Sequence, residues 1–170
     1  MKATRLIVVA LCVSLAACSD HAPTAAPQVP QADLIGSVVG ATGLLKCSAL
    51  PFAQSTATIG PDGGSISAGP HTLTIPAGAL SAPVKITMTV PTGRGVNAVE
   101  FAPEGLQFAR SASLTMSYAN CGLVSNLLPK RIAYVSDNLD ILSYILSLDN
   151  LFTKRVTGQV RHFSDYVIAW

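Results

Sequence analysis

The sequence predicts an all-β fold, an antiparallel β-sandwich. In Val84–Val90 every second residue is apolar and the intervening residues are Lys or Thr. This alternation is typical of a strand with one face in a core and the other in water. Ser111–Tyr118 repeats the pattern. From Thr56 onwards, short runs rich in Val, Ile, Thr and Tyr are separated by Gly, Pro, Asn and Asp, and no long helix is indicated, which favours a sandwich.

The remaining strands follow from the same texture. We expect them at Ser65–Ser67, Thr72–Ile75, Ala98–Phe101, Arg131–Val135, Ile141–Ser147, Lys154–Val160 and Asp165–Ala169. The segment Leu139–Phe152 is densely apolar and also suits a helix. All-β neighbours favour the hairpin interpretation, in which Asp149–Asn150 is the turn into the next strand.

The N-terminus has the three parts of an export signal. Lys2 and Arg5 form a short positive region, Leu6–Ser14 is apolar, and the small residues Ala16–Ala17 follow. The apolar run is too short to cross a bilayer, which takes about 20 apolar residues. Since no later run is long enough either, we do not expect the mature chain to be an integral membrane protein.

The segment Leu15–Cys18 resembles the bacterial lipobox. The resemblance implies removal of residues 1–17 and acylation of the Cys18 thiol with chains such as palmitate, which anchors the protein in a membrane. An ordinary secretory cut after Ser19 is the alternative. Ser19 directly after the cysteine resembles the pattern of outer-membrane sorting. The expected location is therefore the bacterial cell envelope, with the lipid in the outer membrane.

Composition divides the rest of the chain. Ser19–Ala32 is rich in Pro, Ala and Gln, without apolar periodicity, and is typical of a flexible tether. Asp33–Cys47 is more apolar but interrupted by glycines, so a short helix over 34–45 capped by Asp33 and an extended lead-in are both open. We expect a signal peptide at 1–17, a lipidated Cys and tether at 18–46, and the sandwich at 47–170.

The four cysteines have different expected fates. Cys12 leaves with the signal and Cys18 takes the lipid. Cys47 and Cys121 remain, and in an oxidising compartment we predict that they form a disulfide. The bond would close a long loop, for which the loop-entropy model gives roughly 4 kcal/mol. Two separately buried thiols are the alternative.

Charge gives no sign of a nucleic-acid partner. The chain has 11 Lys and Arg against 9 Asp and Glu. Removal of Lys2 and Arg5 with the signal leaves nine of each, so the positive excess belongs to export.

No metal, cofactor or small-molecule site is indicated. His21 lies in the tether and His71 lies at a turn before a strand, so neither belongs to a metal-ligand cluster. Glu100 and Glu104 flank a turn, where two acids are more often solvated than catalytic.

Three segments together resemble the ZU5 domain. They are Gly63–Ile66 (GGSI), Leu73–Leu80 (LTIPAGAL) and Phe101–Phe108 (FAPEGLQF), and the resemblance runs from Thr56 to Tyr118. It implies a β-sandwich whose eukaryotic members bind partner proteins or neighbouring modules. Taken alone, each segment has a scaffold role; Gly63–Gly64, for example, is a turn that requires positive φ.

Residues Arg161–Ser164 (RHFS) carry the one chemically suggestive motif. Some proteins with ZU5 domains cleave themselves between Phe and Ser of a similar sequence. That resemblance implies attack of the Ser164 hydroxyl on the Phe163 carbonyl while His162 moves the proton. The alternative is structural: His162 and Ser164 close a turn, and Phe163 fills the core.

We therefore expect a non-enzymatic, lipid-anchored sandwich that contacts an envelope protein or supports structure. Self-processing at Phe163–Ser164 is one alternative. Carbohydrate binding is another, and it would need an exposed aromatic platform, for which Trp170 is the only Trp in the chain.

Overall fold

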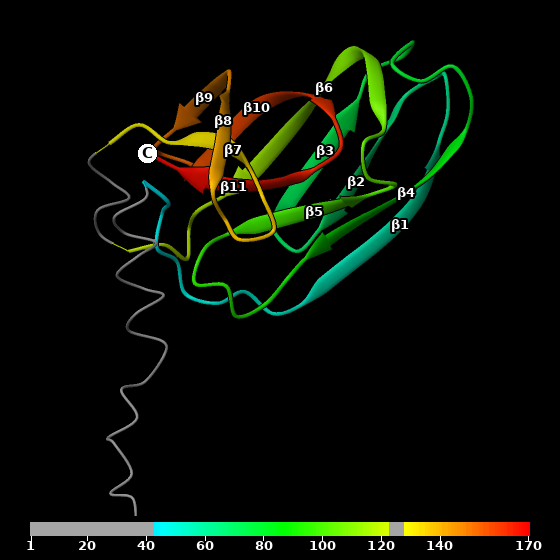
Figure 1. The fold of residues 1–170 in the computed structure, drawn as a ribbon. Coiled ribbons are helices and arrows are strands. Elements are labelled where there is room, and N and C mark those ends of the chain that lie inside the picture. The colour runs from blue at the N-terminus through cyan, green and yellow to red at the C-terminus, as the bar shows by residue number, and fades with distance from the viewer. Residues whose placement is uncertain (1–42, 123–127) are drawn as a thin grey trace, which may run out of the picture.

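The computed structural model describes residues 43–122 and 128–170, which form two antiparallel sheets packed face to face (Figure 1). This arrangement confirms the predicted all-β sandwich. The sheets have the strand orders β1-β4-β5-β11-β7-β8 and β2-β3-β6-β10-β9. The strands are β1 (Ala53–Ile59), β2 (Gly64–Ala68), β3 (His71–Ile75), β4 (Val84–Val90), β5 (Ala98–Ala102), β6 (Gln107–Ser117), β7 (Arg131–Val135), β8 (Ile141–Ile145), β9 (Ser147–Asn150), β10 (Arg155–His162) and β11 (Asp165–Ala169). Within these two described ranges no helix is found, and hence none that could cross a membrane.

The space between the sheets is filled by the side chains that the alternation assigns to the inner face. Ile86 and Met88 on β4 have no exposed surface, and neither do Leu114 and Met116 on β6. All four belong to one cluster that both sheets contribute to. Burial of a large aliphatic side chain is worth about 1.5–3 kcal/mol, so this shared core is what holds the two sheets together.

The turn between β1 and β2 needs glycine, as the sequence predicts. Gly63 has φ of +75°, and its N–H donates to the Gly60 carbonyl oxygen at 3.0 Å. A Cβ at this position would lie 2.4 Å from the Ile75 carbonyl oxygen. Backbone conformation and space therefore both exclude a side chain here.

The sequence pattern does not predict β1, and the strand it predicts at β6 starts too late. The inward positions of β1 hold Ala53, Ser55 and Ala57, which are only half-buried and too small to give a clear alternation of apolar and polar residues. The strand is nevertheless paired with β4 along its whole length. β6 begins at Gln107, not at the expected Ser111, and so runs for 11 residues.

The sequence predicts one strand over Ile141–Ser147, and this prediction is wrong. The segment instead crosses from one sheet to the other. β8 ends at Ile145 on the edge of the six-stranded sheet, and β9 begins at Ser147 on the edge of the five-stranded sheet. Gly158 on β10 makes the crossing fit, because a Cβ there would lie 2.6 Å from the Ile145 Cδ1 atom. Apolar residues on both faces of this segment suit a strand that serves two sheets in turn.

The expected hairpin into the next strand is present, formed by β9 and β10. Its turn lies at 151–154 and not at Asp149–Asn150, which belong to β9. The Asn150 Oδ1 atom accepts the backbone N–H groups of Phe152 and Thr153, each at 3.1 Å. Asn150 therefore shapes the turn from the last position of the strand.

The first described residues pair with the last strand. The Leu45 N–H donates to the Ile168 carbonyl oxygen at 3.0 Å, and the Trp170 N–H donates to the Gly43 carbonyl oxygen at 3.1 Å. Leu44 and Leu45 are each 1% exposed. The chain thus enters the domain beside its own C-terminus (Figure 1).

This pairing corrects the expected domain boundary and one end of the expected helix. Leu44 and Leu45 pack onto the domain in extended conformation, so a helix over 34–45 does not reach them, and the sandwich begins before Cys47. The rest of that segment, 34–42, lies outside the described residues.

Candidate functional site

Several predicted site residues cannot be placed. Cys18, the signal segment 1–17, His21 and the tether to residue 42 lie outside the described residues, and the expectations about them stay predictions. Cys47, His71, Cys121 and the His162–Ser164 motif are all described.

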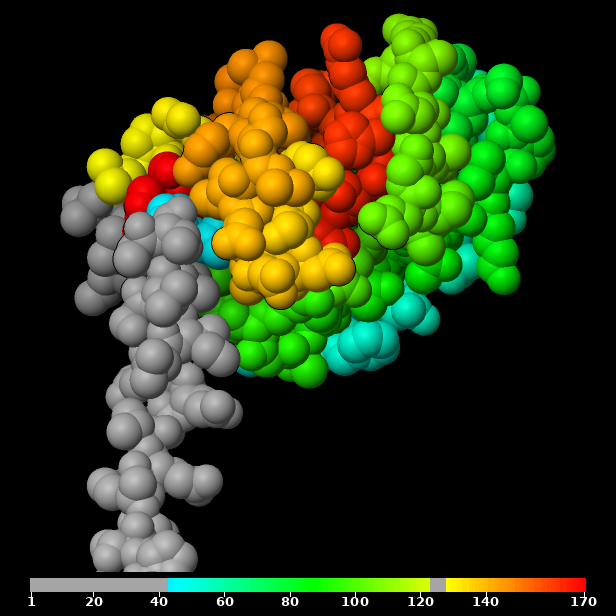
Figure 2. Space-filling model, in the orientation of Figure 1, coloured from blue at the N-terminus to red at the C-terminus, as the bar shows by residue number. Residues whose placement is uncertain are grey.

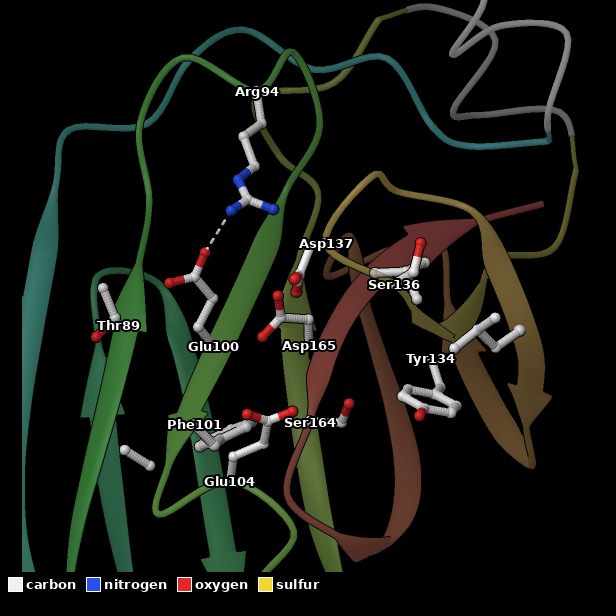
Figure 3. A pocket seen from close by; sticks show the side chains of 13 residues that line it. Thr89, Arg94, Glu100, Phe101, Glu104, Tyr134, Ser136, Asp137, Ser164 and Asp165 are labelled. Atoms are coloured by element: carbon white, nitrogen blue, oxygen red, sulfur yellow. Dashed lines mark hydrogen bonds and ion pairs between the residues drawn. The ribbon is translucent and has the colours of Figure 1, made fainter.

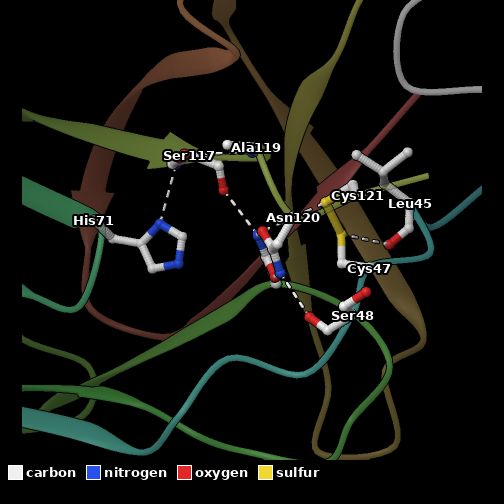
Figure 4. Close-up of a disulfide and its surroundings, with 9 residues drawn as sticks. Leu45, Cys47, Ser48, His71, Ser117, Ala119, Asn120 and Cys121 are labelled. Atoms are coloured by element: carbon white, nitrogen blue, oxygen red, sulfur yellow. Dashed lines mark hydrogen bonds between the residues drawn. A yellow bond between two sulfur atoms is a disulfide. The ribbon is translucent and has the colours of Figure 1, made fainter. Parts of the chain in front are cut away.

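The predicted disulfide is present in the structure, between Cys47 and Cys121, 74 residues apart in the chain (Figure 4). The two cysteines also face each other in an antiparallel β-bridge. The Cys47 N–H donates to the Gly95 carbonyl oxygen at 2.9 Å, and the Ser48 N–H donates to the Asn120 carbonyl oxygen at 3.0 Å. The bond therefore joins the segment that enters the domain to the segment that follows β6.

A pair of asparagines supports this corner. The Asn97 side-chain amide donates to the Ser117 carbonyl oxygen at 2.8 Å and to Asn120 Oδ1 at 2.7 Å. The Asn120 amide donates in return to Asn97 Oδ1 and to the Ser48 carbonyl oxygen. Asn97 is 1% exposed, so its satisfied polar groups hold three segments together without the cost of an unpaired buried amide.

His71 is the first residue of β3, not a turn residue before the strand as expected, and it belongs to the core. It has no exposed surface, its Nδ1 atom accepts the Ser117 N–H at 3.1 Å, and its Nε2 atom has no partner. An accepting Nδ1 places the proton of the neutral ring on Nε2. Burial, and secondarily the positive charge of Arg155, lower the pKa of His71 to about 4. The ring is therefore neutral at physiological pH.

Phe163 fills the core, as the structural interpretation of the His-Phe-Ser motif expects. It is 1% exposed and its ring stacks on Phe101 with centroids 4.7 Å apart. Its N–H donates to the Leu106 carbonyl oxygen at 2.8 Å, and its own carbonyl oxygen accepts the Gly105 N–H at 3.1 Å. Both backbone groups of Phe163, the residue on the carbonyl side of the peptide bond that self-cleavage would break, are thus hydrogen-bonded.

No hydrogen bond joins the His162 ring to the Ser164 hydroxyl. Its Nδ1 atom lies 3.4 Å from the Phe163 carbonyl oxygen, and its ring packs edge-on against Tyr134 with centroids 5.2 Å apart. The Tyr166 hydroxyl donates to the His162 carbonyl oxygen at 2.7 Å. Within the described residues no side chain hydrogen-bonds to Ser164 Oγ.

The structure also forms an acidic groove that sequence reasoning does not find (Figure 3). The groove has a volume of about 580 Å³, and its charged lining residues are Arg94, Glu100, Glu104, Asp137 and Asp165. They come from the loop before β5, from β5 itself, from the turn after it, from the β7–β8 loop and from the start of β11. Glu100 and Glu104 do not flank a turn as expected, because Glu100 lies within β5 and Glu104 within the turn itself. Strand pairing adds acids distant in sequence, which no local motif could signal.

The groove carries an excess of negative charge. Arg94 Nη2 lies 2.8 Å from Glu100 Oε1, an ion pair between two partly exposed side chains. Burial, followed by repulsion from the Glu100 carboxylate, raises the pKa of Asp165, and Arg94 opposes this change. Such a groove suits a cationic group. Among residues 43–122 and 128–170 no cluster of three or more His, Cys, Asp or Glu side chains is arranged to hold a metal ion.

A second surface feature is an apolar ridge on the edge strands. We use this name for Leu142 and Tyr144 on β8, Leu146 between the two strands and Leu148 on β9, which are 54%, 42%, 80% and 78% exposed. Figure 2 shows residues 140–150 as a ridge across the visible face. The Arg131 guanidinium lies over the Tyr144 ring, 5.5 Å from its centroid, in a cation–π contact.

Comparison with known proteins supplies no further assignment. No protein-family model matches the chain, and no curated protein matches it. The resemblance to the ZU5 domain therefore stays a prediction.

The buried His71 ring predicts acid sensitivity. The unfolded chain binds a proton on this residue near pH 6.5, whereas the folded chain binds it only near pH 4, so lowering the pH through this window favours unfolding. We expect a loss of at most about 3 kcal/mol from this residue. His71→Asn keeps an acceptor near the Nδ1 position but does not titrate. Urea unfolding at pH 7.5 and 4.5 should show a smaller loss in the variant, and equal losses would contradict this role.

Proposed function

We propose that the chain is an envelope lipoprotein whose ZU5-like sandwich is a non-catalytic module for protein interaction or structural support. The anchor is Cys18, within the lipobox-like Leu15–Cys18, and Ser19 favours the outer membrane as its location. A disulfide in the folded part is consistent with an oxidising compartment outside the cytoplasm. The burial of Phe163 in the core and the backbone hydrogen bond that His71 accepts support scaffold roles for these two residues.

The observation that supports interaction most strongly is the apolar ridge. β8 and β9 are the edge strands of the two sheets, and they lie consecutively in the chain. An exposed edge with a row of large apolar side chains is a site where another protein pairs or packs. The backbone groups of such an edge give affinity, and alternate side chains give specificity.

The anchor predicts the mass of the mature protein. Purified from membranes, it should give one species that begins at Cys18, carries acyl chains and is uncut between Phe163 and Ser164. In Cys18→Ala the acyl mass should be absent, and the signal should no longer be removed directly before residue 18. An unmodified N-terminus at another residue contradicts the anchor, and two fragments that join at Phe163–Ser164 would restore the self-processing alternative.

The ridge predicts a protein contact in the envelope. A photoreactive amino acid in place of Leu146 should crosslink to a distinct protein in intact cells. The matched control is Thr58, an exposed residue on β1, the opposite edge of the six-stranded sheet. Recovery of lipid alone from position 146, or the same products from both positions, would count against the interaction proposal.

A further inference from the structure

The end of the sandwich where the chain enters exposes a second group of apolar side chains. Leu128, Leu151 and Phe152 are 48%, 46% and 100% exposed. We call these three residues the tip. Leu151 and Phe152 belong to the β9–β10 turn, and Leu128 begins the approach to β7. Three large apolar side chains at loop positions do not contribute to the core of this domain.

Backbone contacts place the tip at the same end as Gly43. The Tyr118 N–H donates to the Lys154 carbonyl oxygen at 2.9 Å, which joins the β9–β10 turn to the end of β6. The Gly122 N–H donates to the Lys46 carbonyl oxygen at 3.3 Å, which joins the residues after β6 to the entering segment. In Figure 1 the first described residues, the C-terminus and the end of β9 lie at one end of the molecule.

A second set of bonds reaches Leu128. The Lys130 N–H donates to Asp149 Oδ2 at 2.8 Å, so the residues before β7 lie against the end of β9. Arg131 pairs in turn with Ala169, whose other neighbour is Leu44. Leu128, the β9–β10 turn and the entering chain therefore form one end face.

Positively charged residues lie in the segments that form this end face. Lys46, Arg131 and Arg155 are exposed and Lys154 is half-buried at this end of the domain. The one acid among them, Asp149, accepts the Tyr118 hydroxyl at 2.7 Å as well as the Lys130 N–H. The acids of the groove, by contrast, gather along β5 and at the start of β11.

We propose that the tip and its surrounding cations form a membrane-facing surface that rests on anionic lipid headgroups. This inference rests on the proposed lipid anchor at Cys18, because the end at which the chain enters is the part of the domain joined most directly to that anchor. Apolar side chains bordered by Lys and Arg are the composition that binds a lipid interface. The cations add attraction to anionic lipids.

Fluorescence quenching by brominated lipids tests the orientation. Trp170 is the only Trp, so Trp170→Phe gives a silent background into which Phe152→Trp or Gln107→Trp is placed. Gln107 is exposed at the opposite end of β6, roughly 30 Å from Ser117 along the strand. Because both positions are exposed, neither change disturbs the core. The full mature chain is reconstituted in vesicles of phosphatidylcholine and phosphatidylglycerol with brominated acyl chains.

We expect quenching of the Trp at 152 and none of the Trp at 107. Quenching at 152 should decrease in vesicles of phosphatidylcholine alone. No quenching at 152, or equal quenching at both positions, would overturn the proposal, as would crosslinking of position 152 to a protein without lipid contact. Equal quenching at 152 in both membranes would overturn the proposed attraction between the cations and anionic lipids.

The mass of the same preparation separates this proposal from the anchor. If the chain carries no lipid, the anchor proposal is wrong, and the unlipidated chain is mixed with the same anionic vesicles. Quenching at 152 would then support a membrane-facing tip by itself, and its absence would overturn it.

Discussion

Residues 43–45 pair with the end of β11, and two residues later the chain is bonded to Cys121. β11 lies between β5 and β7 in the six-stranded sheet, so the entering segment is attached to a central strand and not to an edge. The disulfide closes a long loop, which the chain-entropy model values at about 4 kcal/mol. These contacts determine from which end of the sandwich the preceding chain leaves, and the orientation of every surface relative to an anchor depends on them.

The exposed surfaces are distributed around that fixed end. The tip and its cations lie beside the entering chain, the acidic groove lies along β5 and the start of β11, and the apolar ridge lies on β8 and β9. The ridge exists because the chain changes sheets at Leu146, which makes both edges consecutive in sequence. One segment thus leaves two sheet edges open, and Gly158 allows it to pack closely against β10.

Sequence patterns predict what depends on local alternation and on the chemistry of single residues. The strands at Val84–Val90 and Asp165–Ala169 are found at their expected bounds, and Cys47 and Cys121 are paired. β1 escapes prediction because its inward positions are small. The acidic groove is not predicted from the sequence because Glu100, Asp137 and Asp165 come together only through strand pairing. Where the apolar pattern is equally strong on both faces, as at Leu146, it cannot show that one segment serves two sheets.

The central claim is that the entering segment is fixed to the domain, and amide hydrogen exchange tests it directly. With the disulfide intact, the amides of Leu45 and Trp170 should exchange slowly, because each donates to a backbone carbonyl across the 43–45 and β11 pairing. In a variant with Cys47→Ser and Cys121→Ser they should exchange much faster, while the amide of Met88 in β4 stays protected. Exchange of Leu45 and Trp170 at the rate of an unstructured chain, with the disulfide intact, would contradict the account.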